Sequence, residues 1–216
     1  MLEIKNITFG YNKYKLFKDL SFTANFGEIV KISGPNGCGK TTLLNCINGF
    51  LNVESGDIIF DDVKINNLPV FKISRLGIKR YFPDRYFYDM KVEDILRLIY
   101  SKKESKKIIE TFKYSGEQSS AKLSGGERTL LYLLMSLKDT KLILLDEPFN
   151  NLDKNRIVLI RNFILKLKEN NIAVIITDHS NNIEFDKEIK MEKIDYSTNT
   201  NIDYNYDFLI TPITKV

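Results

Sequence analysis

A glycine-rich segment between Glu28 and Gly49 limits what this chain can fold into more than any other. It reads as an apolar strand (EIVKIS), a loop (GPNGCGKT, residues 34–41) and a helix (TLLNCINGF). The loop fits the pattern G-x-x-x-x-G-K-[ST] at every fixed position. Glycines leave backbone N–H groups open to phosphate oxygens, and the positive end of the following helix points at the same anion. The segment predicts a phosphate-binding loop; a glycine-rich turn before an ordinary helix is the alternative.

Two side chains of this loop, and one aromatic outside it, carry the expected chemistry. Lys40 should reach the outer phosphates as a point charge, and the hydroxyl of Thr41 should ligate Mg²⁺. Tyr11 lies in a turn bracketed by Gly10 and Asn12 and offers a ring on which an adenine could stack. A lone tyrosine is more often a packing residue, so this assignment stays a hypothesis at the level of the sequence.

Composition excludes some classes of protein. The 216 residues suffice for one sizeable core, and the net charge of +4 is too small to indicate nucleic-acid binding. No apolar run reaches the about 18 residues that a membrane span needs, and residues 1–9 lack a signal-peptide pattern. The one dense basic run, at 102–107, reads as a solvated helix face, with a membrane surface or acidic partner as the alternative. Cys38 and Cys46 are predicted to be free thiols, because Cys38 lies in the phosphate loop.

Hydrophobic periodicity predicts the other elements in outline. Alternation at 2–9 and 20–24 predicts strands of a half-exposed antiparallel sheet. The remaining expectations are a strand in 55–62, helices at 92–100 and 106–114, and edge strands in 184–216. Residues 63–90, which two prolines interrupt, give no clear pattern.

A second glycine motif, LSGGE at 123–127, stands at the start of an apolar helix pattern. A serine hydroxyl and two bare glycine amides at a helix N-terminus, here Ser124, Gly125 and Gly126, make a second anion site. A simple capping motif is an equally good reading of these residues alone.

The stretch KLILLDEP (141–148) reads as a strand that is buried on both faces of a parallel sheet and ends in two carboxylates. Asp146 falls at the carboxyl end of the strand, where open α/β sheets place their chemistry, and Glu147 follows it. In an enzyme with a phosphate loop, the first carboxylate holds Mg²⁺ and the second can polarise water. Without that loop, a surface pair before a turn at Pro148 would be the better reading.

A further buried strand at 172–176 leads to the only histidine of the chain, His179. A histidine at the end of such a strand, beside the other strand-end groups, favours a role in the site over a structural one. Between these two strands, Asp153 can N-cap a helix whose apolar stripe includes Ile157, Ile160 and Ile164.

Taken together, these motifs and their order resemble one family closely: the ATP-binding subunits of ABC transporters. The resemblance extends from about residue 2 to residue 180. It implies an α/β fold of the P-loop NTPase class, with a mostly parallel core sheet, an antiparallel β subdomain and a small α-helical subdomain at about 90–138. We expect one ATP-binding domain over 1–216.

The resemblance assigns the site residue by residue. Nucleotide-binding residues are Tyr11, Gly34, Pro35, Asn36, Gly37, Cys38, Gly39, Lys40, Thr41 and Thr42. Catalytic residues are Glu147, His179 and Lys40, and the Mg²⁺ ligands are Thr41 and Asp146. The signature motif, which contacts the ATP of a partner subunit, is Leu123, Ser124, Gly125, Gly126 and Glu127. The D-loop is Asn151, Leu152 and Asp153.

One departure from the family concerns a glutamine that normally lies between the phosphate-loop helix and the helical subdomain. It senses metal or water and couples to the membrane partner. Gln118, the only glutamine here, is too close to LSGGE for that role, and the expected place falls near Tyr81, Phe82 and Asp84. Metal ligation or coupling is therefore expected to differ, with Asp84 as a candidate oxygen ligand.

By resemblance, two such chains face each other head to tail around ATP and Mg²⁺. The partners implied are a second copy or a related ATP-binding subunit, and an integral membrane subunit that docks near residues 70–100, where aromatic residues look exposed. We expect a cytoplasmic location on the inner face of the membrane, with export slightly favoured and no nucleic-acid partner. The alternatives are a non-transport ATPase of this superfamily acting on nucleic acid or ribosomes, and a degenerate subunit that turns ATP over slowly.

Overall fold

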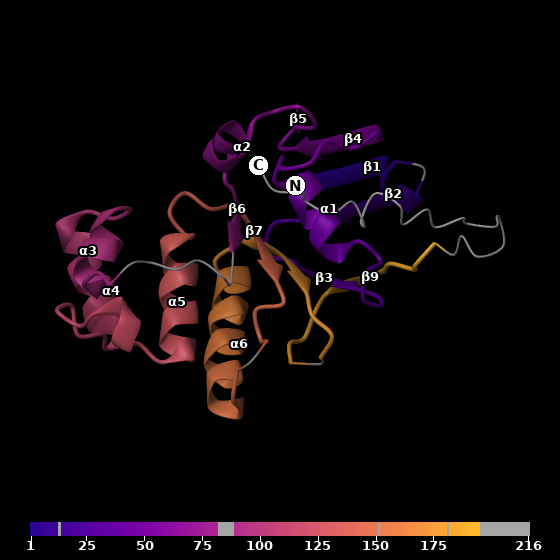
Figure 1. The fold of residues 1–216 in the computed structure, drawn as a ribbon. Helices are drawn as coiled ribbons and strands as arrows, with labels where there is room; N and C mark the ends of the chain where they lie inside the picture. The colour runs from indigo at the N-terminus through magenta and orange to yellow at the C-terminus, as the bar shows by residue number, and fades with distance from the viewer. Residues whose placement is uncertain (13, 82–88, 151, 181, 195–216) are drawn as a thin grey trace, which may run out of the picture.

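The structure of this protein is a computed structural model, in which two β-sheets and a set of helices enclose two apolar cores (Figure 1). The part of the chain that it describes comprises residues 1–12, 14–81, 89–150, 152–180 and 182–194.

The antiparallel sheet has the strand order β2-β1-β4-β5. Its strands are β1 (Leu2–Tyr11), β2 (Tyr14–Ala24), β4 (Ser55–Phe60) and β5 (Val63–Lys64). The sheet is confirmed, but β2 begins earlier than predicted, and Tyr11 ends a strand instead of lying in a turn. Irregularities in the β1–β2 register and positive φ angles at Asn6 and Asp19 hide the alternation that would have marked the longer strand.

The central sheet is parallel throughout, in the order β6-β7-β8-β3-β9. Its strands are β3 (Ile29–Ser33), β6 (Ile78–Tyr81), β7 (Leu142–Asp146), β8 (Ala173–Thr177) and β9 (Lys187–Lys190). Strand β9 confirms an edge strand after residue 184. The rest of that prediction, over 195–216, lies outside the described residues.

The helices are α1 (Lys40–Ile47), α2 (Val70–Leu76), α3 (Val92–Arg97), α4 (Lys102–Phe112), the 3₁₀ turn η1 (Ser120–Lys122), α5 (Gly125–Met135) and α6 (Lys154–Glu169). Helix α3 is shorter than predicted. Helix α4 starts earlier than predicted because Ser101 and Glu104 form a capping box at its start. Within the described part of the chain, no helix is both long enough and apolar enough to cross a bilayer.

The two cores lie on opposite faces of the parallel sheet, because successive side chains of a strand point to opposite faces. On β7, Leu142 and Leu144 join the core that the antiparallel sheet and α1 cover, whereas Ile143 and Leu145 join the core beneath α5 and α6. Figure 1 shows α3, α4 and α5 together on the side of the molecule away from β1 and β2. The carboxyl ends of β3, β7 and β8 meet at one edge, where the candidate site lies.

Candidate functional site

The phosphate loop connects β3 to α1 and depends on glycine at defined positions. Gly34 and Gly39 have φ angles of +144° and +100°, where side chains are strained, and a Cβ at Gly34 would lie 2.2 Å from the carbonyl oxygen of Met191. Lys40 is 7% exposed, and its Nζ donates to the carbonyl oxygens of Gly34 at 2.9 Å and Pro35 at 3.2 Å. The ammonium group therefore lies over the loop, which is the placement that phosphate binding requires.

A cavity of about 410 Å³ opens over this loop. Its lining brings Gly37, Lys40 and Thr42 of the loop region next to Leu16 of β2 and to Glu147 after β7. Among the other predicted nucleotide-binding residues, Pro35 and Asn36 are exposed at the loop, and Cys38 is a buried free thiol.

Tyr11 lies on the β1–β2 hairpin, whose second strand contributes Leu16 to this cavity. Its ring is exposed and packs edge-on against Phe9, with ring centroids 5.2 Å apart. One face of an aromatic ring is thus available near the phosphate loop, and adenine stacking on Tyr11 stays a prediction.

Asp146, at the end of β7, accepts hydrogen bonds from three side chains. Its Oδ1 accepts from the hydroxyl of Thr177 at 2.7 Å and from that of Thr41 at 3.2 Å, and its Oδ2 lies 2.9 Å from Nη2 of Arg80. The side chains of Arg80 and Asp146 are 4% and 15% exposed, so this ion pair is buried. The sequence prediction that Thr41 and Asp146 lie together is thereby met.

The residues present fit a magnesium ion. The Thr41 hydroxyl and the Asp146 carboxylate supply two oxygen donors side by side, and Mg²⁺ in phosphate-binding sites typically takes only one or two protein ligands. Among the described residues there is no cluster of three or more Asp, Glu, His or Cys side chains that would hold a metal without the nucleotide. Thr41 and Asp146 are the residues that would hold Mg²⁺.

Glu147 and His179 face each other at the same edge of the sheet. Oε1 of Glu147 lies 3.0 Å from Nε2 of His179, and Oε2 accepts a hydrogen bond from the side-chain amide of Asn150. The backbone of Glu147 has a φ of +46° and its N–H donates to the carbonyl and hydroxyl oxygens of Thr177, both at 3.0 Å. This fixed, partly exposed carboxylate is suited to act on a water molecule.

Arg80 and Thr177 are site residues that the sequence reasoning missed. Thr177 joins the carboxylate of Asp146 to the backbone of Glu147, and its place at the end of a buried strand was a usable signal. Arg80 lies in a strand that the sequence left unassigned. Burial lowers the pKa of its guanidinium, and the adjacent Asp146 carboxylate opposes that shift.

The second anion site is the N-terminus of α5. Ser124 caps this helix: its Oγ accepts from the N–H of Glu127, and its own N–H donates to the Glu127 carboxylate at 2.8 Å. Leu123 is buried before it, Gly125 is exposed, and Gly126 is buried against the side chain of Arg156. The capping reading of these residues is confirmed, and the anion-site reading stays a prediction.

Two of the three predicted D-loop residues, Leu152 and Asp153, are described and directly precede α6. Asp153 N-caps α6 through the N–H of Arg156 at 3.0 Å, as predicted, and also pairs with the Nε of Arg156 at 3.0 Å. Leu152 lines a cavity of about 530 Å³ that has Gly125 on one side and Glu147 on the other. Asn151 lies outside the described residues.

The region of the missing glutamine is described only in part. Tyr81 ends β6 and is buried, whereas Phe82 and Asp84 lie outside the described residues. Gln118 lies in the loop before η1, where its carbonyl oxygen accepts from the N–H of Val92, so it belongs to the helical part of the molecule.

Comparison with known proteins decides the family. The ABC transporter family model matches residues 17–150, which span the phosphate loop, the LSGGE motif and Asp146. This chain belongs to the ABC transporter family. The expectation of a P-loop NTPase fold with an antiparallel and a helical subdomain is confirmed, and the chain is an ATP-binding subunit with ATPase activity.

Relatives and solved structures agree with this assignment. The lipopolysaccharide export system ATP-binding protein LptB of Escherichia coli (strain K12) is 32% identical over 194 residues, covering 83% of this chain and 80% of LptB. The ABC transporter ATP-binding protein YtrB of Bacillus subtilis (strain 168) is 32% identical over 186 residues, covering 83% of this chain and 63% of YtrB.

Among solved structures, a nucleotide-free ATP-binding cassette from an ABC transporter superposes with a TM-score of 0.79 at 27% identity, covering 90% of this chain and 89% of that one. The ADP conformation of the cassette MJ1267 gives a TM-score of 0.78 at 27% identity, with 89% of each chain covered. These structures support nucleotide binding by this chain.

Proposed function

We propose that this ATPase subunit works as a dimer with a second copy or a related ATP-binding subunit, each ATP lying between residues 34–42 of one chain and Ser124–Gly126 of the other. The start of α5 is the observation that carries the proposal. Gly125 is exposed there, and the backbone N–H groups of a helix N-terminus bind anions. Lys40, Thr41 and Asp146 form one phosphate site in this chain, and the exposed start of α5 is proposed to complete the corresponding site of the other chain.

In this arrangement each residue of the site has a defined task. Lys40 leaves its loop carbonyls and contacts the outer phosphates, and Mg²⁺ held by Thr41 and Asp146 neutralises phosphate charge. Glu147 accepts a proton from the attacking water, and His179 donates a hydrogen bond to the γ-phosphate. The negative charge of the γ-phosphate is bound by phosphate-binding surfaces of both chains. Hydrolysis of ATP removes the γ-phosphate, and the two chains can then separate.

The variant Glu147→Gln tests this proposal. Loss of the proton acceptor should lower turnover by about 10²–10⁴-fold while ATP still binds, so the variant should accumulate as an ATP-dependent dimer. Turnover and light scattering after size-exclusion chromatography measure the two effects. Glu110→Gln, an exposed glutamate of α4, is the matched control. Wild-type turnover of Glu147→Gln, or a variant that stays monomeric in ATP, would contradict the proposal.

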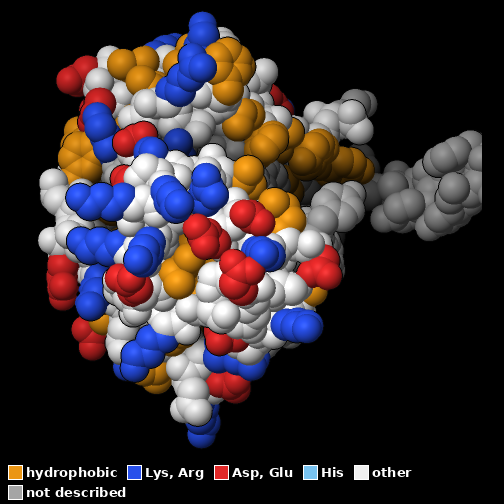
Figure 2. All heavy atoms as spheres, turned by 90° about the vertical axis from the view of Figure 1, so that its left-hand side faces the viewer, with side chains coloured by type: hydrophobic (Ala, Val, Ile, Leu, Met, Phe, Trp, Pro, Cys, Tyr) orange, Lys and Arg blue, Asp and Glu red, His pale blue; other side chains and the backbone are white. Residues whose placement is uncertain are grey.

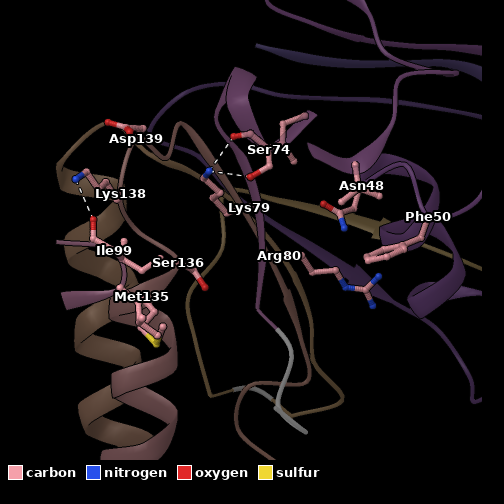
Figure 3. Close-up of a pocket in the computed structure, with 13 residues that line it drawn as sticks. Asn48, Phe50, Ser74, Lys79, Arg80, Ile99, Met135, Ser136, Lys138 and Asp139 are labelled. Carbon is pink, nitrogen blue, oxygen red and sulfur yellow. Dashed lines mark hydrogen bonds between the residues drawn. The ribbon is translucent and has the colours of Figure 1, made fainter. Parts of the chain in front are cut away.

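A groove on another face of the molecule is the proposed docking surface for the membrane subunit. It has a volume of about 410 Å³ and runs between Phe50, just after α1, and Leu98 and Met135 of the helical part. Phe50 is 52% and Leu98 62% exposed. Figure 3 shows Phe50 on one side of the opening and Met135, Ile99 and Lys138 on the other. A groove that combines exposed apolar side chains with lysines, here Lys79 and Lys138, suits one face of an amphipathic segment.

The groove overlaps the predicted docking region 70–100 in part and extends beyond it. Among the aromatic residues of this region, Phe71 is 56% exposed and Tyr81 is buried, whereas those at 82–88 lie outside the described residues. Phe50 and Leu98 add exposed apolar surface. The lysines of α4, at 102–107, are exposed. Figure 2 shows Lys and Arg spread among Asp and Glu on the face formed by the helical part. Such a mixed surface favours the reading of a solvated helix face for this run.

A matched pair of leucines tests the docking surface. Leu98→Asp should reduce recovery of the chain with the membrane fraction by tenfold or so, because a buried unpaired charge at an interface costs a few kcal/mol. Leu159→Asp, an exposed leucine of α6 outside the groove, is the control. Equal recovery of both variants would remove the groove from the proposal.

We also propose that the chain acts on the cytoplasmic side of the membrane and that the transport is export. The relative in Escherichia coli, which is named as part of an export system, supports this direction. ATP-dependent accumulation of substrate inside inverted membrane vesicles, once the membrane subunit is identified by co-purification, would test it.

A further inference from the structure

Arg80, which also lines the groove beside Phe50, places a positive charge next to Asp146, and none of the recognised motifs accounts for this charge. It lies on β6, and its guanidinium is 2.9 Å from Oδ2 of Asp146, the carboxylate that together with Thr41 fits Mg²⁺. The same guanidinium donates through Nη1 to the side chain of Asn45 on α1, the helix that begins at the phosphate loop. With a 4% exposed side chain, Arg80 is enclosed between these partners.

In the nucleotide-free chain, Arg80 therefore acts as the cationic partner of Asp146. Its other oxygen is already engaged by Thr177, so the carboxylate is held from both sides. A metal ion that uses Asp146 then meets a carboxylate whose charge is largely balanced, in surroundings where opposite charges interact strongly because water is excluded. In the absence of a metal, a carboxylate that is balanced by Arg80 repels phosphate less than an unpaired carboxylate would.

We propose that Arg80 is a positioning residue that holds Asp146 in the nucleotide-free chain and competes with Mg²⁺ for it, so that this subunit binds ATP with an unusually weak dependence on Mg²⁺. The inference rests on the proposed Mg²⁺ ligands Thr41 and Asp146. Arg80 takes over part of the charge balance that the metal provides, and the metal must displace or share the Arg80 contact in order to reach Asp146.

The test is binding of a non-hydrolysable ATP analogue to the full chain by calorimetry, in EDTA and over a series of Mg²⁺ concentrations. Arg80→Met should weaken binding in EDTA by about tenfold and lower the Mg²⁺ concentration for half-maximal tightening by about tenfold, the size of one charged hydrogen bond. Arg80→Lys keeps the charge but lacks the forked guanidinium, so it should shift both quantities by only a few fold.

Lys79→Met is the matched control, because it removes a neighbouring charge of β6 whose Nζ bonds to Ser74 instead of Asp146. It should bind like the wild type in both conditions. A merely structural role for Arg80 would lower affinity equally with and without Mg²⁺, and that result would overturn the inference. If Arg80→Met does not fold, an unshifted Mg²⁺ series for Arg80→Lys would overturn it as well.

Asp146→Asn separates the inference from the proposed site on which it rests. If this variant keeps the wild-type Mg²⁺ dependence, the proposed metal ligands are wrong. If it abolishes that dependence while the Arg80 variants behave like Lys79→Met, the metal ligands stand and the role of Arg80 is wrong.

Discussion

The loop at 34–41 and the start of α5, which are the two proposed phosphate-binding corners of this chain, differ in charge and in burial. The loop corner is charged and enclosed: Lys40 and Arg80 are buried, and Asp146 accepts hydrogen bonds from three side chains. The α5 corner carries no buried charge. It consists of a capped helix start with an exposed glycine, Gly125.

This difference separates the tasks of the two corners. The loop corner can bind nucleotide without a second chain, because its charged groups are already arranged in the folded chain. Binding then requires little further ordering of these groups. At the start of α5, the serine and the glutamate already form hydrogen bonds with each other's backbone N–H groups. Only the remaining N–H groups of the helix N-terminus are left to bind a phosphate. The first corner should therefore govern affinity in the monomer, and the second should govern association.

The largest expected contrast comes from Lys40→Met. Loss of a charge-assisted contact to phosphate should cost about 1.5–3 kcal/mol of binding free energy, roughly a tenfold to hundredfold loss of nucleotide affinity in the monomer. Calorimetry with ADP measures it. Lys187→Met is matched, because Lys187 also donates from Nζ to two oxygens, those of Thr23, yet lies at the start of β9, opposite Val30 and away from the carboxyl end of β3. Equal affinities of the two variants would show that the loop corner does not govern binding.

The loop corner was predictable from the sequence to the residue, and the reason is chemical. Phosphate binding requires glycine at positions of positive φ and a lysine at one spacing, so Gly34, Gly39 and Lys40 are visible without any structure. The carboxylate pair at Asp146 was visible too, because a continuous apolar run marks a buried parallel strand and fixes where the strand ends.

What the sequence did not reveal depends on contacts between distant segments. Strand β6 and helix α2 occupy 63–90, where each element is too short for its periodicity to be seen. No local pattern there marks Arg80 as buried. Its burial becomes understandable only beside Asp146, which lies far along the chain and is brought to it by the pairing of β6 with β7. An ion pair between neighbouring parallel strands leaves no local pattern.

Two adjacent glycines at the start of α5, Gly125 and Gly126, separate a role in folding from a role in dimerisation. A Cβ at Gly126 would lie 2.6 Å from Cγ of Arg156, so Gly126→Ala should destabilise the fold by about 1–3 kcal/mol through overpacking. At Gly125 the nearest atom, Nη1 of Arg156, is 3.5 Å away, so Gly125→Ala should fold normally. It should instead weaken ATP-dependent dimerisation, because the added methyl group lies on the exposed surface.

Thermal unfolding and light scattering in ATP separate these two outcomes. The double variant Gly126→Ala/Arg156→Ala should recover the stability that the single variant loses, because it removes the crowded side chain. If Gly125→Ala and Gly126→Ala lower stability equally, the two glycines are both part of the fold, and the exposed one has no separate role at an interface.

The smallest expected effect is on stability and dimerisation when the N-cap serines of two helices with the same capping box are replaced. Ser124 with Glu127 and Ser101 with Glu104 form capping boxes at α5 and α4, so each Ser→Ala variant should lose about 1 kcal/mol of stability. Only Ser124→Ala should also lose ATP-dependent dimerisation, since of the two helices only α5 is proposed to face a partner's nucleotide. Light scattering at matched folded fraction measures this. A dimer that survives Ser124→Ala as well as Ser101→Ala would mean that the serine of the second corner serves the helix alone, and that phosphate is held there by glycine N–H groups without a hydroxyl.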